Sequence, residues 1–174
     1  GKCGVLTEGE GIFGEISRVT VAVGEVACEG KAADFKEILE DQEIIKTGYD
    51  LKFQRNILAH NGIKLRGIFR DIELMHYLIN PEKSHKIEIL AKAYLNVSLE
   101  EESDALEQFE SLSLFDEIPE EETAPSRTQE AVAAYLLGDR IWEEMETANL
   151  CGLYETMEEP LLKVLSDMEM EGVK

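Results

Sequence analysis

The sequence has 174 residues, of which 44% are hydrophobic, and this is enough to bury one sizeable core in a single domain. It carries 37 Asp and Glu against 17 Lys and Arg, which gives a formal net charge of −20. Because affinity for a phosphate backbone comes mainly from cations, and the cations here are dispersed along the chain, this composition disfavours tight binding of nucleic acid. No apolar run approaches the ~18 residues of a membrane span.

Nothing in the sequence directs export, so we expect a soluble, cytoplasmic protein with no membrane partner. Cys3, Cys28 and Cys151 are odd in number and show no CxxC spacing, which is typical of free thiols in a reducing compartment. The chain begins without Met and ends inside a helical pattern, and we therefore expect it to be a piece of a longer protein.

The first third of the chain predicts an antiparallel meander followed by a helix and a further strand. Residues 5–7, 18–23 and 25–28 have the β-branched, alternating character of strands. From Ala33 the hydrophobic period becomes helical, and residues 44–48 then predict a short buried strand. The chain thus begins with strands that pair with their neighbours.

The middle of the chain alternates between helix and strand. Residues 51–60 predict a helix with Asp50 as its N-cap. The apolar alternation over residues 63–68 predicts a strand, and Asp71 is placed to cap a helix over residues 72–79. Strands followed by alternating helices and strands indicate a mixed sheet flanked by helices.

The last part of the chain is helical apart from an acidic insertion. Residues 87–95 predict an amphipathic helix, and two long helices are expected over residues 128–148 and 153–171. After the helix over residues 87–95, residues 98–130 hold twelve carboxylates against the single cation of Arg127, and we expect this segment to be partly mobile.

Four blocks of the sequence closely resemble the proofreading 3′–5′ exonuclease region of bacterial DNA polymerase I, a family-A polymerase. Residues 48–54 (Gly-Tyr-Asp-Leu-Lys-Phe-Gln) lie where that family has Gly-x-Asn-Leu-Lys-[Tyr/Phe]-Asp. Residues 60–68 resemble its Gly-Ile-x-Leu-x-Gly connector, and residues 69–81 resemble its Phe-Asp-Thr-Met-Leu-x-x-Tyr-Leu-Leu-x-Pro block with one residue inserted. Residues 158–173 resemble the helix that leads into the polymerase thumb.

The resemblance implies an α/β fold of the ribonuclease-H-like (DnaQ-like exonuclease) type, with a mixed five-stranded sheet flanked by helices. It also implies a division into an exonuclease-like domain over residues 1–149 and a helix over residues 150–174 that leads into a polymerase domain. The hydrophobic periodicity of the chain leads to the same outline of the fold independently of the resemblance.

The family hydrolyses a phosphodiester with two metal ions, which its carboxylates hold. In the family, these carboxylates come from an Asp-x-Glu on the first strand, an Asp after the Leu-Lys-[Tyr/Phe] segment, and an Asp four residues beyond a Tyr. Matched to this sequence, Leu6 takes the place of the bridging Asp and Glu8 that of the Glu. Gln54 takes the place of the second Asp, and Tyr135 and Asp139 match the last motif.

This set of residues predicts a degenerate site. The apolar Leu6 cannot bridge metals, and the neutral amide of Gln54 does not offset the charge of an ion. Asp50 stands at the position of the family Asn and is better explained as a helix cap. Glu8 and Asp139 remain, as a weak site for one ion at best, so we expect no cofactor; Mg²⁺ or Mn²⁺ would be required if the site were active. The register of the first strand is open, because Glu8 and Glu10 also form a Glu-x-Glu pair.

Three functions follow from these residues. The leading one is a degenerate, inactive exonuclease domain that supports the polymerase domain of the same chain in DNA replication and repair, with DNA bound through the parent DNA-directed DNA polymerase. The second is an active 3′–5′ exonuclease with rearranged carboxylates, drawn from Glu8, Glu10, Asp50 and Asp139. The third is an acidic protein-interaction module that recruits a basic partner through residues 98–130.

Overall fold

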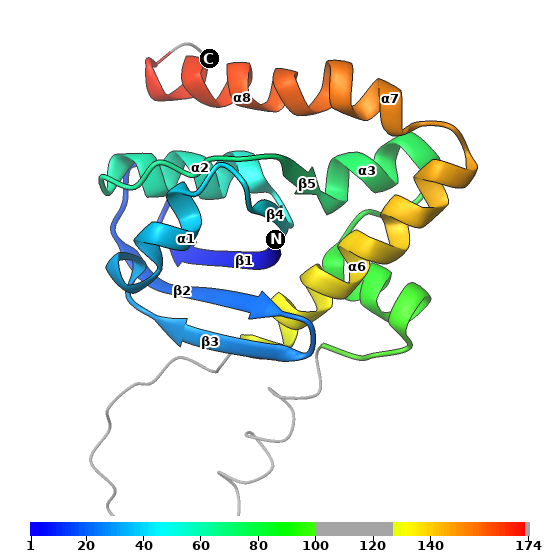
Figure 1. The fold of residues 1–174 in the computed structure, drawn as a ribbon, viewed down its shortest axis with the longest axis horizontal. Helices are drawn as coiled ribbons and strands as arrows, with labels where there is room; N and C mark the ends of the chain where they lie inside the picture. Colours follow the sequence, from blue (N-terminus) through cyan, green and yellow to red (C-terminus); the bar gives the residue numbers. More distant parts are fainter. Residues whose placement is uncertain (100–126, 173–174) are drawn as a thin grey trace, which may run out of the picture.

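A five-stranded mixed sheet forms the centre of the protein, as the computed structural model shows for the residues that it describes, 1–99 and 127–172 (Figure 1). The strands lie in the order β3-β2-β1-β4-β5. In chain order they are β1 (Lys2–Gly9), β2 (Ile16–Val23), β3 (Val26–Gly30), β4 (Ile45–Gly48) and β5 (Phe69–Asp71). The first three form an antiparallel meander, whereas β4 pairs with β1 and β5 pairs with β4 in parallel.

Helices cover both faces of this sheet (Figure 1). A 3₁₀ turn at Ala32–Phe35 leads into α1 (Lys36–Glu40), and α2 (Leu51–His60) follows β4. After β5 come α3 (Ile72–Ile79) and α4 (Ile87–Leu90), which continues into a π-helical turn at Ala91–Leu95. The C-terminal part consists of α6 (Thr128–Thr147), α7 (Cys151–Leu153), a π-helical turn at Tyr154–Glu158 and α8 (Glu159–Met170).

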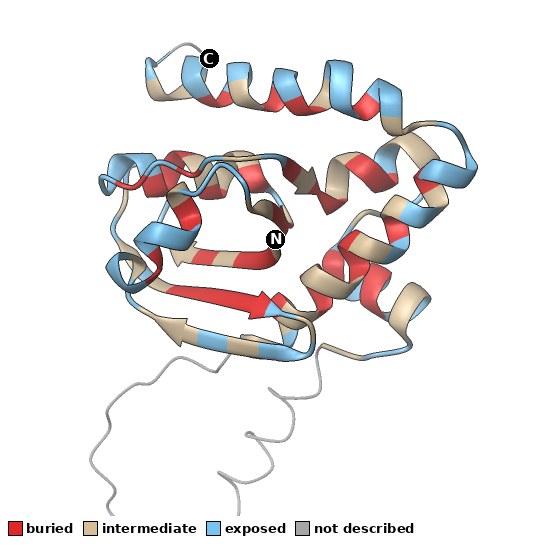
Figure 2. Ribbon diagram, viewed as in Figure 1, coloured by how far each residue is buried: buried red, intermediate tan, exposed pale blue. Residues whose placement is uncertain are grey.

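The sheet separates two hydrophobic cores, because successive side chains of a strand point to opposite faces. Cys3 and Val5 of β1 pack in the core that includes residues of α1 and α2. The second core gathers α3, α4 and α6 around the fully buried Tyr154. Figure 2 shows the buried residues of each helix on the side that faces the rest of the protein. By the same alternation, Lys2, Gly4, Leu6 and Glu8 share the face of β1 that α6 covers.

The helix α6 lies unusually close to the sheet and runs antiparallel to β1. A Cβ atom on Gly138 would lie 2.1 Å from Cγ2 of Thr47 on β4, and one on Gly4 would lie 2.8 Å from the carbonyl oxygen of Ala131. Glycine at these two positions therefore allows the helix and the sheet to approach each other. This contact decides which residues of α6 can reach each residue of β1.

Most of the expected elements are confirmed, including the antiparallel meander, the helix over residues 51–60 and both predicted N-caps. Asp50 accepts a hydrogen bond from the N–H of Phe53, and Asp71 accepts one from the N–H of Leu74. The predicted mixed five-stranded sheet flanked by helices is confirmed as well. No helix of the described ranges is long and apolar enough to cross a membrane.

One predicted strand is wrong. Residues 63–68 do not join the sheet; the fifth strand is β5, and Lys46 pairs with Phe69 in its register. Ile63 and Leu65 are buried while their neighbours are exposed, which explains the alternation in the sequence. This alternation records which side chains point inward, but it does not show whether the backbone pairs with a strand. Of the acidic insertion predicted over residues 98–130, residues 100–126 lie outside the described ranges.

The carboxylate of Asp71 joins β5, α2 and α3 while it is buried. One oxygen accepts a hydrogen bond from the N–H of Leu74 at 3.1 Å, and the other accepts one from the N–H of Leu51 at 2.7 Å. Burial raises the pKa of Asp71 to about 7, against the lowering effect of these two donors. The carboxyl group is therefore easier to protonate in the folded protein than in the unfolded chain.

We expect Asp71→Asn to remove a pH dependence of stability. Because the folded pKa of Asp71 lies above its unfolded value, this group favours the folded state most below pH 4, and its contribution is lost as the pH rises to about 7. The free energy of unfolding of the unmodified protein should therefore fall, relative to that of the variant, between pH 4 and pH 7. Urea unfolding at several pH values measures this difference. Asp50→Asn is the control, since Asp50 also caps a helix but is exposed. If the free energies of unfolding of Asp71→Asn and the unmodified protein changed with pH in parallel, the raised pKa of Asp71 would be contradicted.

Candidate functional site

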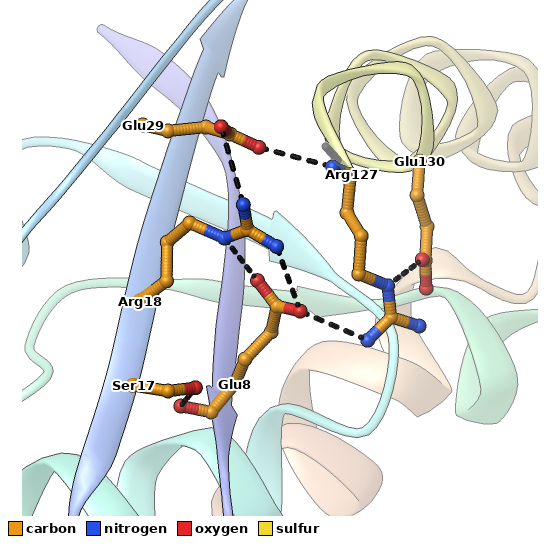
Figure 3. A network of polar contacts seen from close by, with 6 residues as sticks. All are labelled: Glu8, Ser17, Arg18, Glu29, Arg127 and Glu130. Carbon is orange, nitrogen blue, oxygen red and sulfur yellow. Dashed lines mark hydrogen bonds and ion pairs between the residues drawn. The ribbon is translucent and has the colours of Figure 1, made fainter. Parts of the chain in front are cut away.

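The end of β1 holds Glu8 directly opposite Arg18 of β2, in register across the antiparallel pair. The guanidinium group contacts both carboxylate oxygens, with Nε 2.7 Å from Oε2 and Nη2 3.3 Å from Oε1 (Figure 3). A second interaction joins Nη1 of Arg18 to Oε2 of Glu29 on β3, at 3.4 Å. Two antiparallel strand pairs are thus linked through one arginine.

Arg127, the residue just before α6, adds a second arginine to this group. Nε of Arg127 lies 2.7 Å from Oε2 of Glu130, and Nη1 lies 3.5 Å from Oε1 of Glu8 (Figure 3). The backbone N–H of Arg127 donates to Oε1 of Glu29 at 3.0 Å. Burial raises the pKa of Glu130, and the neighbouring Arg127 partly opposes that effect. Glu8, Glu29 and Glu130 are therefore held together by two guanidinium groups, and we call these five residues the arginine–glutamate cluster.

A pocket of ≈ 720 Å³ opens beside Glu8, and its volume lies within the range of about 300–1,000 Å³ that is typical of ligand sites. Its charged lining consists of Glu8, Glu10, Glu15 and Arg127, and Phe53 of α2 adds an aromatic side chain. Three carboxylates against one guanidinium give this pocket an excess of negative charge. Such a lining repels a phosphate backbone unless bound cations reverse the sign.

Tyr135 and Asp139 lie at the other end of β1. The ammonium group of Lys2 bonds directly to a carboxylate oxygen of Asp139 and lies 4.6 Å from the centroid of the Tyr135 ring. Lys2 and Glu8 are six residues apart on one strand, which corresponds to about 20 Å. The structure therefore does not bring Asp139 and Glu8 to one place, and no single ion can bind both carboxylates.

Gln54 is buried in the core side of α2. Its Nε2 donates to the carbonyl oxygen of Tyr49 at 3.0 Å, and its Oε1 has no hydrogen-bond partner among the described residues. Leu6 lies on the α6 side of β1, two residues from Glu8, and offers no donor atom to an ion. Both positions thus hold neutral side chains, as the sequence indicates.

Asp50 belongs to a separate part of the surface. It caps α2 with a left-handed backbone (φ 50°), and it lines a pocket of ≈ 340 Å³ together with Asp71, Glu73 and Glu158. The four carboxylates of a rearranged active site, Glu8, Glu10, Asp50 and Asp139, are accordingly divided among three places: two line the acidic pocket, one lies beside α3, and one pairs with Lys2.

The residues present do not fit the two metal ions of an exonuclease site. Across the part of the chain that the structure describes, no group of three or more His, Cys, Asp or Glu side chains is placed to hold an ion. Glu8 and Glu130 are neighbours, but arginines contact them. Glu130, Arg18 and Lys2 are site residues that the sequence motifs did not predict. Glu130 had a usable signal, because Arg127 and Glu130 are three residues apart at a helix start and so face the same side.

The sheet consists of an antiparallel meander followed by two parallel strands, and a long helix crosses one of its faces. The end of the first strand is acidic. These features define a ribonuclease-H-like α/β domain of the exonuclease type. The comparison with known families agrees. The model of the family described as DNA polymerase I, ribonuclease H-like domain, matches residues 14–105, which is more than half of the chain. The chain belongs to this family.

The curated DNA polymerase I relatives are much longer than this chain. DNA polymerase I of Bacillus subtilis is 30% identical over 153 residues, which cover 86% of this chain and 17% of that protein. DNA polymerase I of Pseudomonas aeruginosa is 27% identical over 172 residues, which cover 96% of this chain and 19% of that protein. The chain thus spans less than a fifth of the length of these relatives.

Solved structures share the fold. The POL domain of Pol1 from M. smegmatis, in complex with DNA primer-template and dNTP, has a TM-score of 0.75 at 20% identity, with 98% of this chain and 29% of that chain covered. Brucella melitensis NrnC with bound Mg²⁺ has a TM-score of 0.72 at 17% identity, with 98% of this chain and 86% of that chain covered. At these identities the likeness establishes the fold alone.

We expect Gln54→Asp to destabilise the protein rather than to create a metal site. The new carboxylate would be buried, which should lower the free energy of unfolding by about 3 kcal/mol at pH 7. Since protonation removes the charge, the loss should shrink at pH 5. Urea unfolding with and without Mg²⁺ measures both effects.

Gln54→Asn is the matched control, because it shortens the side chain equally without adding a charge. Its loss of stability should be smaller and should not depend on pH. If Mg²⁺ restored the stability of Gln54→Asp but not that of Gln54→Asn, the surrounding residues would form a usable ion site after all.

Proposed function

We propose that this chain is a degenerate, non-nucleolytic 3′–5′ exonuclease domain of a DNA polymerase I, and that it acts as structural support for the polymerase domain. One observation carries the proposal. The two carboxylates that match the family motifs, Glu8 and Asp139, lie at opposite ends of β1, and each is paired with a basic side chain of the same chain. A two-metal mechanism needs its carboxylates to hold two ions about 4 Å apart.

The electrostatics of the pocket beside Glu8 support the same conclusion. An editing site has to attract the 3′ end of a DNA strand, and it does so with metal ions and cations. Here the lining carries three carboxylates and one arginine, within a chain of net charge −20. A strand that entered this pocket would be repelled by its carboxylates.

The C-terminal helix offers a surface for the supporting role. The inner side of α8 is fastened to α2: Arg55 pairs with Asp167 at 2.7 Å, and Glu169 pairs with Lys52 and Asn56 at 2.6 and 2.8 Å. Figure 1 shows α8 lying along α2. Its outer side and the turn before it expose a row of large apolar side chains, Leu153, Met157, Leu161, Val164, Leu165 and Met168. An exposed apolar row of this size is typical of an interaction surface.

The proposed roles of the two parts of the chain follow the predicted domain boundary. Residues 1–149 form the exonuclease-like domain, and residues 150–174 lead into the polymerase domain of the same chain, which covers the apolar row. DNA is bound through that polymerase domain in replication and repair, in the cytoplasm, and this chain contributes little binding of its own. No cofactor is needed for such a role. The acidic interaction module remains an alternative that depends on residues outside the described ranges.

A nuclease assay tests the loss of activity. The substrate is a DNA with a 3′ single strand, incubated with Mg²⁺ and then with Mn²⁺, beside Glu8→Ala and Asp139→Ala. We expect no cleavage by the unmodified chain above the level of either variant, because no ion is held beside an attacking water. Cleavage that Glu8→Ala abolishes would instead establish an active exonuclease with rearranged carboxylates.

A substitution on α8 tests the supporting surface. Val164→Asp changes a side chain that is 53% exposed, so the midpoint of thermal unfolding of this chain alone should stay within about 1 °C. In a longer chain that includes the polymerase domain, burying the new charge should loosen the junction and increase proteolytic cleavage near residues 150–174 severalfold.

Ala33→Asp is the control for this experiment, since it adds the same charge at an exposed position in the 3₁₀ turn before α1. It should leave cleavage at the junction unchanged. Equal cleavage of Val164→Asp and the unmodified longer chain would contradict the proposed role of the apolar row.

A further inference from the structure

The arginine–glutamate cluster holds its carboxylates with cations that belong to the protein. We propose that Arg18 and Arg127 act as an internal cationic clamp, which takes the place of divalent ions between Glu8 and Glu130 and fastens the start of α6 to the sheet. The idea that the arginines take the place of metal ions rests on the proposed function and deepens it. The role of the arginines in fastening α6 to the sheet is independent of the proposed function.

The cluster connects the three consecutive strands β1, β2 and β3 to the start of α6, which is distant from them in sequence. Arg18 of β2 contacts Glu8 of β1 and Glu29 of β3, so it ties together three neighbouring strands (Figure 3). Arg127, just before α6, contacts Glu8, Glu130 and, through its backbone, Glu29. The point where the chain enters α6 is therefore held to both β1 and β3.

The burial of these groups makes the positive charge necessary. The side chains of Glu8 and Glu130 are only 14% and 17% exposed, and Glu29 is 23% exposed. Water screens the repulsion between partly buried carboxylates poorly. Three carboxylates can gather here because two guanidinium groups lie between them, each donating in several directions at once.

The same geometry engages both carboxylate oxygens of Glu8, to which a divalent ion would have to bind. Both of its carboxylate oxygens already accept from Arg18, and one also faces Arg127. An ion that took these oxygens would have to displace Arg18, whose own side chain is only 20% exposed. That displacement would bring an ion and two guanidinium groups together, so like charges would replace favourable pairs.

Arginine substitutions in this chain test the fastening role. Arg127→Gln should lower the midpoint of thermal unfolding by several degrees, and Arg18→Gln by more, because Arg18 is the more buried of the two. Arg140→Gln on the exposed side of α6 is the matched control and should change the midpoint by about 1 °C or less. If Arg127→Gln and Arg18→Gln behaved like Arg140→Gln, the clamp would be refuted.

A double-mutant cycle separates coupling from general damage. Glu8→Gln and Arg127→Gln should each destabilise the protein, but together they should cost less than the sum of the two, because each single change breaks the same interaction. Arg127→Lys should recover only part of the loss, since lysine keeps the charge but cannot contact two carboxylates with a planar fork. Strict additivity in the cycle would contradict the proposed interaction.

Mn²⁺ tests the replacement of metal by arginine. Millimolar Mn²⁺ should not raise the midpoint of unfolding of the unmodified chain, but it should raise that of the Arg18→Gln/Arg127→Gln double variant, whose carboxylates lack a cation. The rise should disappear when Glu8→Gln is added. The proposal that arginine takes the place of metal would be overturned if Mn²⁺ raised the unfolding midpoint of the unmodified chain and Glu8→Gln removed that rise. It would also be overturned if Mn²⁺ did not raise the midpoint of the double variant.

The two proposals fail in different ways. DNA cleavage by the unmodified chain would refute the proposed loss of nuclease activity, yet it would leave the unfolding midpoints and the cycle of Glu8 and Arg127 unaffected. Conversely, an additive cycle would refute the clamp even if no cleavage were seen.

Discussion

The close contact between α6 and the sheet is the constraint on which the candidate site depends. Gly138 has no side chain to separate the helix from Thr47, and Gly4 leaves space for the backbone of Ala131. Because α6 then runs antiparallel to β1 at a fixed register, its first turn meets Glu8 and its middle meets Lys2. Which charges become neighbours is decided by this packing.

Charge compensation within the chain is the common feature of the site. In a two-metal nuclease, carboxylates can gather because ions offset their repulsion. In this protein, Arg18 and Arg127 offset Glu8, and Lys2 offsets Asp139. A carboxylate that is satisfied by the chain's own cations contributes to the stability of the fold. The same carboxylate is then less available to an ion, which links the architecture of the domain to the loss of chemistry that we propose.

The local chemistry of the sequence predicted much of the fold. The caps at Asp50 and Asp71 were predictable because a short carboxylate before an amphipathic run satisfies the free N–H groups of a helix start. The strand expected at residues 63–68 failed because the alternation of buried Ile63 and Leu65 arises in an extended connector. Hydrophobic period reports the direction of side chains, whereas strand pairing requires a partner backbone at the right distance.

The sequence by itself determined which functional side chains are present. It showed that an apolar Leu6 and a neutral Gln54 stand where the family has carboxylates, and this holds in any conformation. Only the tertiary structure decided that Asp139 pairs with Lys2, about 20 Å along β1 from Glu8, and that Arg127 joins Glu8 to Glu130. The physical reason is that a motif on one helix fixes only the spacing along that helix. The register of the helix against the sheet is set by packing at Gly4 and Gly138, which are far apart in the sequence and meet partners on other elements only in the folded chain.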